Sequence, residues 1–213
     1  MSAIASWSEQ VRNHHAQSIR AMGGEEPAGD FWVPHAHRFV ADPRRTDDPE
    51  VARLSQLLDP GDSLLDVGGG AGRLALPLAL TCRHATVVEP SSAMVKLLLQ
   101  SATEAGIDNI TAIQENWEDV EVLPADVVLC AHVVYGDEDI EGFIAKMTAN
   151  ARKSVAILLY FSSPQTPISP FWSRVHHEER VHLPAVPELL TVLWEMGIFP
   201  DVEMLRTIET KPL

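Results

Sequence analysis

The stretch Leu64-Leu65-Asp66-Val67-Gly68-Gly69-Gly70-Ala71-Gly72-Arg73 decides the fold of this chain. Its first residues indicate a buried β-strand with an acid near its end, and four glycines follow within five positions. A turn so poor in side chains lets backbone N–H groups approach a ligand closely, and the N-terminus of the following helix points into the same gap. In a doubly wound α/β sheet, a nucleotide-like ligand binds at such a turn.

A second acid supports this interpretation. The apolar stretch His84-Ala85-Thr86-Val87-Val88 ends at Glu89, which follows Asp66 by 23 residues. In nucleotide-binding folds, an acid at the tip of the second strand, about 20 residues on, binds ribose hydroxyls. We therefore expect the Glu89 carboxylate to lie close to Gly70.

Apolar stretches and helical periodicity alternate beyond this pair. We expect strands over 63–67, 85–89, 109–114, 125–131 and 154–161, and helices over 49–58, 73–82, 93–105, 137–149 and 186–196, with a short helix within 170–179. Ser91 is the expected N-cap of helix 93–105 and Gly106 its C-cap. The alternation predicts an α/β, Rossmann-like, doubly wound and mostly parallel sheet with helices on both faces.

The N-terminal part is less regular. Residues 1–22 have the spacing of an amphipathic helix, and Gly23-Gly24 ends it. The segment 31–39 is dense in aromatic residues and histidines, so it is either a short helix that packs on the core or a lid over cofactor and substrate. We expect residues 1–48 to form an N-terminal helical lid and residues 49–213 to form the Rossmann-like domain.

Composition and charge narrow the classes of partner. The net charge is −14 and the sequence pI about 4.9, which argues against nucleic acid as a partner because an acidic protein repels phosphate. No apolar run approaches the length of a membrane span, and the first 20 residues do not resemble a signal peptide. Cys82 and Cys130 lie in apolar segments, as expected of reduced core residues. We expect a cytoplasmic protein without membrane association.

Two other kinds of site are disfavoured. The pattern Asp66-x-Gly68-x-Gly70-x-Gly72 lacks the third glycine of G-x-G-x-x-G, because Arg73 stands there. Neither tyrosine begins the Tyr-x-x-x-Lys of short-chain nicotinamide reductases, so an NAD(P)-dependent oxidoreductase remains the weaker alternative. The histidine pairs have no acid or cysteine beside them at a ligand spacing, so we expect no metal.

The glycine stretch resembles the first motif of class I S-adenosylmethionine-dependent methyltransferases. Three further stretches resemble later motifs of that family in the right order: Val88-Glu89-Pro90-Ser91-Ser92-Ala93-Met94, Glu115-Asn116-Trp117, and Ala125-Asp126-Val127-Val128-Leu129-Cys130-Ala131-His132-Val133-Val134-Tyr135. The last of these is similar to the motif of small-molecule members. The resemblance implies S-adenosylmethionine as cofactor and a small-molecule methyl acceptor as partner.

The resemblance also implies roles for individual residues. Asp66, Gly68, Gly70 and Gly72 would hold the methionine part of the cofactor, and Glu89 followed by Pro90 would hold the ribose. Met94, Asn116 and Trp117 would contact the adenine, and Ala131 would border the methyl group. Many relatives carry Asp where this chain has Asn116, but an amide oxygen still accepts a hydrogen bond from the adenine amine.

Catalysis would need little beyond alignment of the acceptor. Methyl transfer from a sulfonium is an in-line displacement, and an oxygen or nitrogen acceptor that holds a proton benefits from a general base. His132 is our candidate, with Tyr135 next, although His132 could equally shape the pocket wall. A cofactor-binding regulatory or partner module without catalysis is the main alternative, since no residue here is obligatory for the reaction.

The last expected strand, within 201–208, raises one further point. The family usually places an antiparallel seventh strand beside the sixth, and only a few residues follow this stretch. We therefore expect either that the natural chain is longer or that another molecule covers the edge, as in a homodimer.

Overall fold

A computed structural model describes residues 1–24 and 29–205. The chain divides into two compact units, and the boundary passes through two of the strands. The strand unit comprises Asp30–Leu129, Asn150–Ala156 and Asp201–Leu213, and the helical unit comprises Met1–Gly29, Cys130–Ala149 and Ile157–Pro200.

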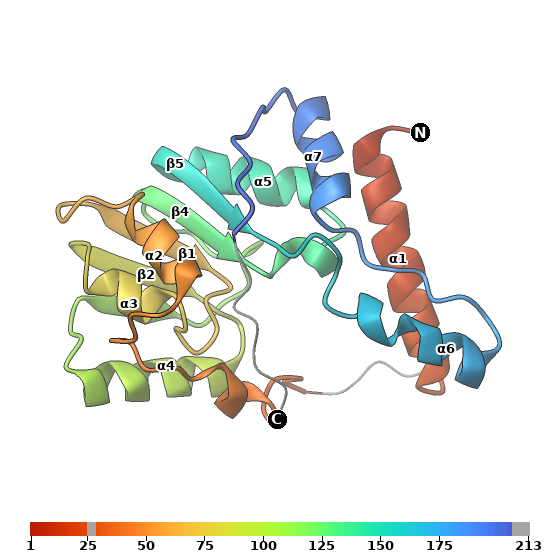
Figure 1. The fold of residues 1–213 in the computed structure, drawn as a ribbon, viewed down its shortest axis with the longest axis horizontal. Helices are drawn as coiled ribbons and strands as arrows, with labels where there is room; N and C mark the ends of the chain where they lie inside the picture. Colours follow the sequence, from red (N-terminus) through yellow and green to blue (C-terminus); the bar gives the residue numbers. More distant parts are fainter. Residues whose placement is uncertain (25–28, 206–213) are drawn as a thin grey trace. The chain divides into compact units, whose positions relative to one another are not determined.

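The sheet has five parallel strands in the order β3-β2-β1-β4-β5 (Figure 1). The strands are β1 (Ser63–Val67), β2 (His84–Val88), β3 (Ile110–Ile113), β4 (Ala125–Ala131) and β5 (Ala151–Leu158). β1 pairs with β2 from Ser63↔His84 to Val67↔Val88, so the two strands end side by side. The strand order reverses beside β1, and ligands of doubly wound sheets bind at such a switch point. The predicted Rossmann-like fold is confirmed.

Helices in the strand unit follow the expected local signals. They are α2 (Pro49–Ser55), α3 (Ala75–Ala79) and α4 (Ser92–Ala105), with the 3₁₀ turn η1 (Ala36–Phe39). Ser91 Oγ accepts a hydrogen bond from the Met94 N–H, and Gly106 ends α4 in the left-handed conformation, as predicted. α3 contacts β1 and β2, and α4 contacts β3. This packing fixes the glycine turn between β1 and α3.

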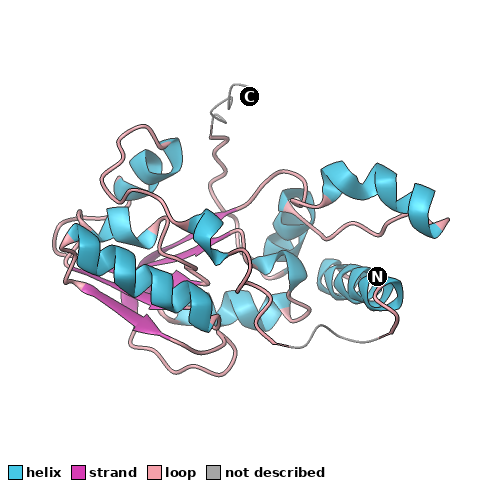
Figure 2. Cartoon of the chain, turned by 90° about the horizontal axis from the view of Figure 1, so that it is seen from below, coloured by secondary structure: helices cyan, strands magenta, loops and turns pink. Residues whose placement is uncertain are grey.

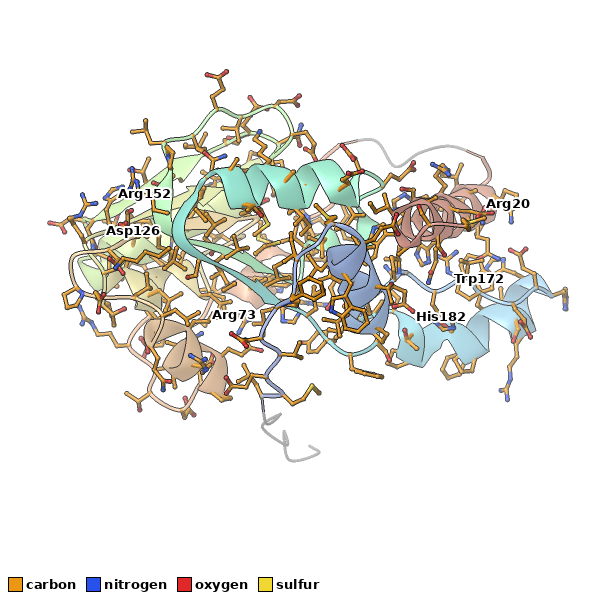
Figure 3. The ribbon with its side chains drawn as sticks, turned by 90° about the horizontal axis from the view of Figure 1, so that it is seen from above. Arg20, Arg73, Asp126, Arg152, Trp172 and His182 are labelled. Carbon is orange, nitrogen blue, oxygen red and sulfur yellow. The ribbon has the colours of Figure 1, made fainter. Side chains whose placement is uncertain are left out.

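The amino end of the sheet carries a separate polar anchor. Ser63 donates to Asp126 Oδ2 from both its backbone N–H and its hydroxyl, each over 2.8 Å. Arg152, at the start of β5, lies 4.0 Å from the same carboxylate, as labelled in Figure 3. Since ligands bind at the carboxyl ends of the strands, this cluster holds β1, β4 and β5 in place rather than forming part of a site.

The helical unit is built on α1 (Ala3–Ala21), which contacts α5 (Ile140–Ala149) and α7 (Val186–Glu195). It also contains η2 (Val134–Gly136), η3 (Thr166–Ile168) and α6 (Ser169–His176). Figure 2 draws the helices in cyan and the strands in magenta. Trp7 and Val11 of α1 are fully buried, and Trp7 Nε1 donates to the Asp137 carbonyl over 2.8 Å. The predicted amphipathic helix is confirmed. The assignment of 1–48 as a lid stays a prediction.

The predicted boundaries were wrong by two or three residues at three starts and three ends. α2, α3 and β5 each end three residues before the predicted end, at Ser55, Ala79 and Leu158. α3 begins at Ala75 rather than 73, because the turn continues through Gly72 with positive φ. α5 begins at Ile140 rather than 137, since the Asp137 side chain caps a tight turn by accepting the Asp139 N–H. β5 begins at Ala151 rather than 154, because its charged first residues find partners: Lys153 Nζ lies 2.6 Å from Asp62 Oδ1.

The predicted last strand was also wrong where it can be checked. Residues 201–205 form no strand, and the rest of the stretch lies outside the described residues. Val202 and Met204 are exposed, whereas a strand buries one of its faces. The expectation of a homodimer stays a prediction.

Within residues 1–24 and 29–205, no helix has the length and apolar character that crossing a membrane requires. Cys82 and Cys130 are buried free thiols, as predicted.

Candidate functional site

The glycine turn brings the ends of β1 and β2 together. The Gly68 N–H donates to the Val88 carbonyl over 2.7 Å, and the Gly70 N–H donates to Glu89 Oε2 over 2.9 Å. Gly70 has a φ of 56°, and a Cβ on Gly69 would lie 2.6 Å from Asp66 Oδ2. The backbone thus lies close to both acids, and the predicted proximity of Glu89 to Gly70 is confirmed.

Each oxygen of the Glu89 carboxylate accepts a backbone hydrogen bond. The Glu89 side chain is buried, and Oε1 accepts the Ser91 N–H over 2.9 Å while Oε2 accepts from Gly70. Burial raises the pKa of Glu89, and the two backbone N–H groups partly oppose that shift. A carboxylate offers about four lone-pair positions, so two remain for hydroxyl donors of a ligand.

The buried carboxylate of Asp66 has one oxygen that receives no hydrogen bond from the described residues. Asp66 is 1% exposed, and this oxygen is Oδ1. Burial and the charge of Glu89 raise the pKa of Asp66 to about 7. A buried acceptor without a partner costs about 1–3 kcal/mol, and a ligand ammonium would remove that cost. The amino-acid end of S-adenosylmethionine carries such a group, so the residues fit this cofactor.

The start of α4 forms the next part of this site. Met94 is buried and packs with Ala71 of the glycine turn and with Ala36 of η1. Asp30 accepts hydrogen bonds from the Ser91 hydroxyl over 2.7 Å and from the Trp32 N–H over 2.9 Å. The sequence indicated Met94 but not Asp30, because a contact between residues 61 positions apart leaves no local pattern.

The remaining predicted residues of the strand unit differ in exposure. Pro90 and Asn116 are exposed, and Trp117 is 5% exposed. The Asn116 side chain donates to Asp119 Oδ2 over 3.4 Å, and its carbonyl accepts the Val120 N–H over 3.1 Å. This turn presents the Asn116 amide at the surface and turns Trp117 inward. Their contact with adenine stays a prediction.

An arginine network that the sequence did not reveal follows the glycine turn. Arg73 Nη1 lies 2.6 Å from Glu50 Oε2, and Arg45 donates to both Asp48 Oδ2 (2.7 Å) and the Arg73 carbonyl (2.8 Å). Figure 3 labels Arg73. Arg45 and Glu50 therefore brace the backbone that follows Gly72.

The helical unit holds the other predicted residues. Ala131 ends β4 and is half-buried, and His132 follows it with a φ of 60°, a conformation that costs a non-glycine residue about 1–3 kcal/mol. His132 Nδ1 and Tyr135 Oη are 3.2 Å apart, and Oη accepts the Tyr160 N–H over 2.7 Å. The Tyr160 ring stacks on the His132 imidazole at 4.3 Å. Burial raises the pKa of Tyr135 to about 12.

This cluster can position and move a proton. With its hydroxyl protonated, Tyr135 either donates to Nδ1 or accepts from an Nδ1–H, and the tautomer of His132 decides which. When neutral His132 carries its proton on Nδ1 and donates it to Tyr135, the lone pair of the imidazole is on Nε2. No sequence motif indicated Tyr160 as a candidate site residue. Its position depends on the end of β5, which lies beside His132 because the His132 N–H donates to the Leu158 carbonyl over 2.8 Å.

One histidine of the predicted pairs, His14, has partners within the helical unit. His14 is buried in α1, where Nδ1 lies 2.6 Å from the Val181 carbonyl and Nε2 lies 2.7 Å from Arg180. In the described part of the chain, no group of three or more His, Cys, Asp or Glu side chains could hold a metal ion.

Comparison with known proteins agrees with this geometry. Residues 64–154 match the family described as "Methyltransferase domain". Ribosomal RNA small subunit methyltransferase G of Mycolicibacterium smegmatis is 38% identical over 73 residues, which cover 33% of this chain and 31% of that protein. The protein of the same name from Coxiella burnetii is 42% identical over 57 residues, or 26% of this chain and 28% of its own length. The chain thus spans about a third of these relatives.

A solved structure matches over more of the chain. The magnesium protoporphyrin IX methyltransferase ChlM of Synechocystis PCC 6803, with bound SAH, has a TM-score of 0.61 and 18% identity, covering 92% of this chain and 90% of its own. At that identity the match shows the fold alone.

These relatives correct one prediction. The exclusion of nucleic acid as a partner was wrong, because the curated relatives are named as ribosomal RNA methyltransferases. Net charge describes the whole surface, whereas binding depends on the local field around a site. The match to the methyltransferase-domain family covers residues 64–154, less than half of the chain, and the sheet order β3-β2-β1-β4-β5 is that of a doubly wound fold, so this region is similar to methyltransferase domains.

Proposed function

We propose that this protein is an S-adenosylmethionine-dependent methyltransferase that acts on an oxygen or nitrogen atom of its acceptor. One observation carries the proposal: two buried carboxylates converge on the glycine turn, Glu89 bonded to the Gly70 N–H at 2.9 Å and Asp66 with an oxygen that lacks a partner. The first suits ribose hydroxyls and the second an ammonium group.

Bound S-adenosylmethionine supplies a methyl group on a positively charged sulfur, which needs no further activation. The residues of the chain then bind the cofactor and orient it. Asp66 and the backbone of the glycine turn hold the amino-acid end, Glu89 holds the ribose, and Met94, Asn116 and Trp117 surround the adenine. Binding in this way provides most of the rate enhancement by fixing the geometry of attack.

In the helical unit, His132 is the proposed general base. In the tautomer in which Nδ1–H donates to Tyr135 Oη, Nε2 carries the lone pair that takes the acceptor's proton. Tyr135 remains protonated at neutral pH because burial raises its pKa to about 12, so it orients the imidazole rather than acting as the base.

The test measures binding and turnover separately. Calorimetry compares S-adenosylhomocysteine with NAD, and tritium-labelled S-adenosylmethionine is then offered with two acceptor pools, RNA that includes ribosomal small subunits and a small-molecule extract. We expect binding of S-adenosylhomocysteine and label transfer to one pool. Binding of NAD alone would overturn the proposal, and cofactor binding without transfer to either pool would favour the non-catalytic module.

A further inference from the structure

Asp30 lies at the beginning of α4 although it is far from that helix in sequence. Its Oδ2 accepts the Ser91 hydroxyl over 2.7 Å and the Ala93 N–H over 3.4 Å, and its Oδ1 accepts the Trp32 N–H over 2.9 Å. A carboxylate is favourable at this end of a helix, where backbone N–H groups lack partners. The hydrogen bond from Ser91 is the main reason that the pKa of Asp30 is lowered.

Ser91 links Asp30 to the ribose-binding acid. Its hydroxyl has one proton, which it donates to Asp30, and its oxygen accepts the Met94 N–H over 3.2 Å. Its backbone N–H donates to Glu89 Oε1 over 2.9 Å. The Asp30 carboxylate therefore selects the rotamer of Ser91, and Ser91 in turn fixes both Glu89 and the first turn of α4.

The same carboxylate also anchors the segment that follows it. Through the Trp32 N–H, Asp30 orders the turn that leads to η1, and Ala36 at the start of η1 is 2% exposed. Ala36 packs on Ala71 of the glycine turn and on Met94. Residues 30–36 are therefore fastened to two residues that border the expected cofactor position.

We propose that Asp30 is a positioning residue of the cofactor site: it acts through Ser91 on Glu89 and Met94, and it makes residues 30–36 part of the wall around the adenosine. This inference rests on the proposed binding of S-adenosylmethionine. Neither the sequence motifs nor the matched region, which begins at residue 64, includes Asp30.

Calorimetry with S-adenosylhomocysteine on the full chain tests this role. Asp30→Ala should weaken binding about tenfold, the loss expected for one hydrogen bond to a charged group, and Asp30→Asn should bind with intermediate affinity because its amide oxygen still accepts. Asp47→Ala, which removes an exposed acid from the same N-terminal region, is the matched control and should bind like the wild type. Wild-type affinity in both Asp30 variants would overturn the proposal.

A double-mutant cycle distinguishes action through Ser91 from a general loss of stability. Once Ser91→Ala has removed the donor, Asp30→Ala should cost much less affinity than in the wild type, and full additivity of the two losses would contradict the proposal. The pH profile adds a second readout. Because the charge of Asp30 helps to raise the pKa of Glu89, Asp30→Asn should move the acid limb of binding to lower pH. An unmoved limb would leave only a structural role and overturn the proposal.

Failure of this inference can be told apart from failure of the proposed function. If the wild-type protein binds S-adenosylhomocysteine and the Asp30 variants bind it equally well, only the role of Asp30 falls. If the wild-type protein does not bind it at all, the proposed function falls first.

Discussion

The backbone N–H of Gly70 donates a 2.9 Å hydrogen bond to Oε2 of Glu89, and this bond joins the turn after β1 to the tip of β2. It exists because the two strands are paired in register to their last residues, Val67 beside Val88. Two features that lie 19 residues apart in the sequence are thus in direct contact.

Glu89→Gln tests the ribose-binding role. The substitution keeps the shape of the side chain but removes its charge, and hydrogen bonds to a charged acceptor are about twice as strong as neutral ones. We expect the affinity for S-adenosylhomocysteine to fall about tenfold or more by calorimetry. Glu104→Gln, on an exposed part of α4, is the control. Equal affinities of the two variants would argue against a role for Glu89.

Gly72→Ala tests the packing that shapes the turn. Gly72 has a φ of 82°, and a Cβ there would lie 2.9 Å from Leu76 Cγ and closer still to a Leu98 methyl group. The free energy of unfolding in urea should fall by about 1–3 kcal/mol. Gly61→Ala is the matched control, since a Cβ at that position meets no atom within 4 Å, and it should change stability little.

The raised pKa of Asp66 predicts a pH effect of known sign. Its pKa is about 7 in the folded chain and near 3.8 when unfolded, so the folded chain binds the extra proton between those values. The stability that depends on Asp66 is therefore highest at low pH and falls as the pH rises from about 4 to about 7. Urea unfolding should show that the wild type loses stability relative to Asp66→Asn over this range. A constant difference would contradict the burial argument.

His14 predicts the opposite slope in the helical unit. Burial is the largest cause that lowers its pKa below 6.5, and Arg180 also disfavours its charged form. Its contribution is present above pH 6.5 and is lost as the pH falls below that value, because the unfolded chain then binds more protons. The stability of the wild type relative to His14→Asn should decrease on acidification below pH 6.5. A difference that grows on acidification would show that His14 is charged in the folded state.

The proposed general base predicts a kinetic effect. Once an acceptor is identified, His132→Gln should lower kcat about a hundredfold or more and leave the affinity for S-adenosylhomocysteine unchanged. Tyr135→Phe should lower kcat less, since it removes only the group that orients the imidazole. Unchanged turnover in His132→Gln would remove His132 from the mechanism.

Local patterns predicted most of the strand unit. β4 has the predicted bounds because it is almost wholly apolar, and α4 lies between a serine cap and a glycine cap that act within one turn. The features that were missed depend on distant partners. β5 begins at Ala151 because the charged Lys153 can pair with Asp62. Asp30 contacts the start of α4 because Ser91 faces it, and Tyr160 stacks on His132 only once β4 and β5 are in place.

The central claim is that the glycine turn after β1 and Glu89 after β2 bind S-adenosylmethionine. A crystal structure with S-adenosylhomocysteine tests this claim most directly. We predict that the Glu89 carboxylate accepts hydrogen bonds from the ribose hydroxyls and that the ligand ammonium lies against Asp66 Oδ1. A ligand bound elsewhere, with Asp66 Oδ1 still without a partner, would contradict the account.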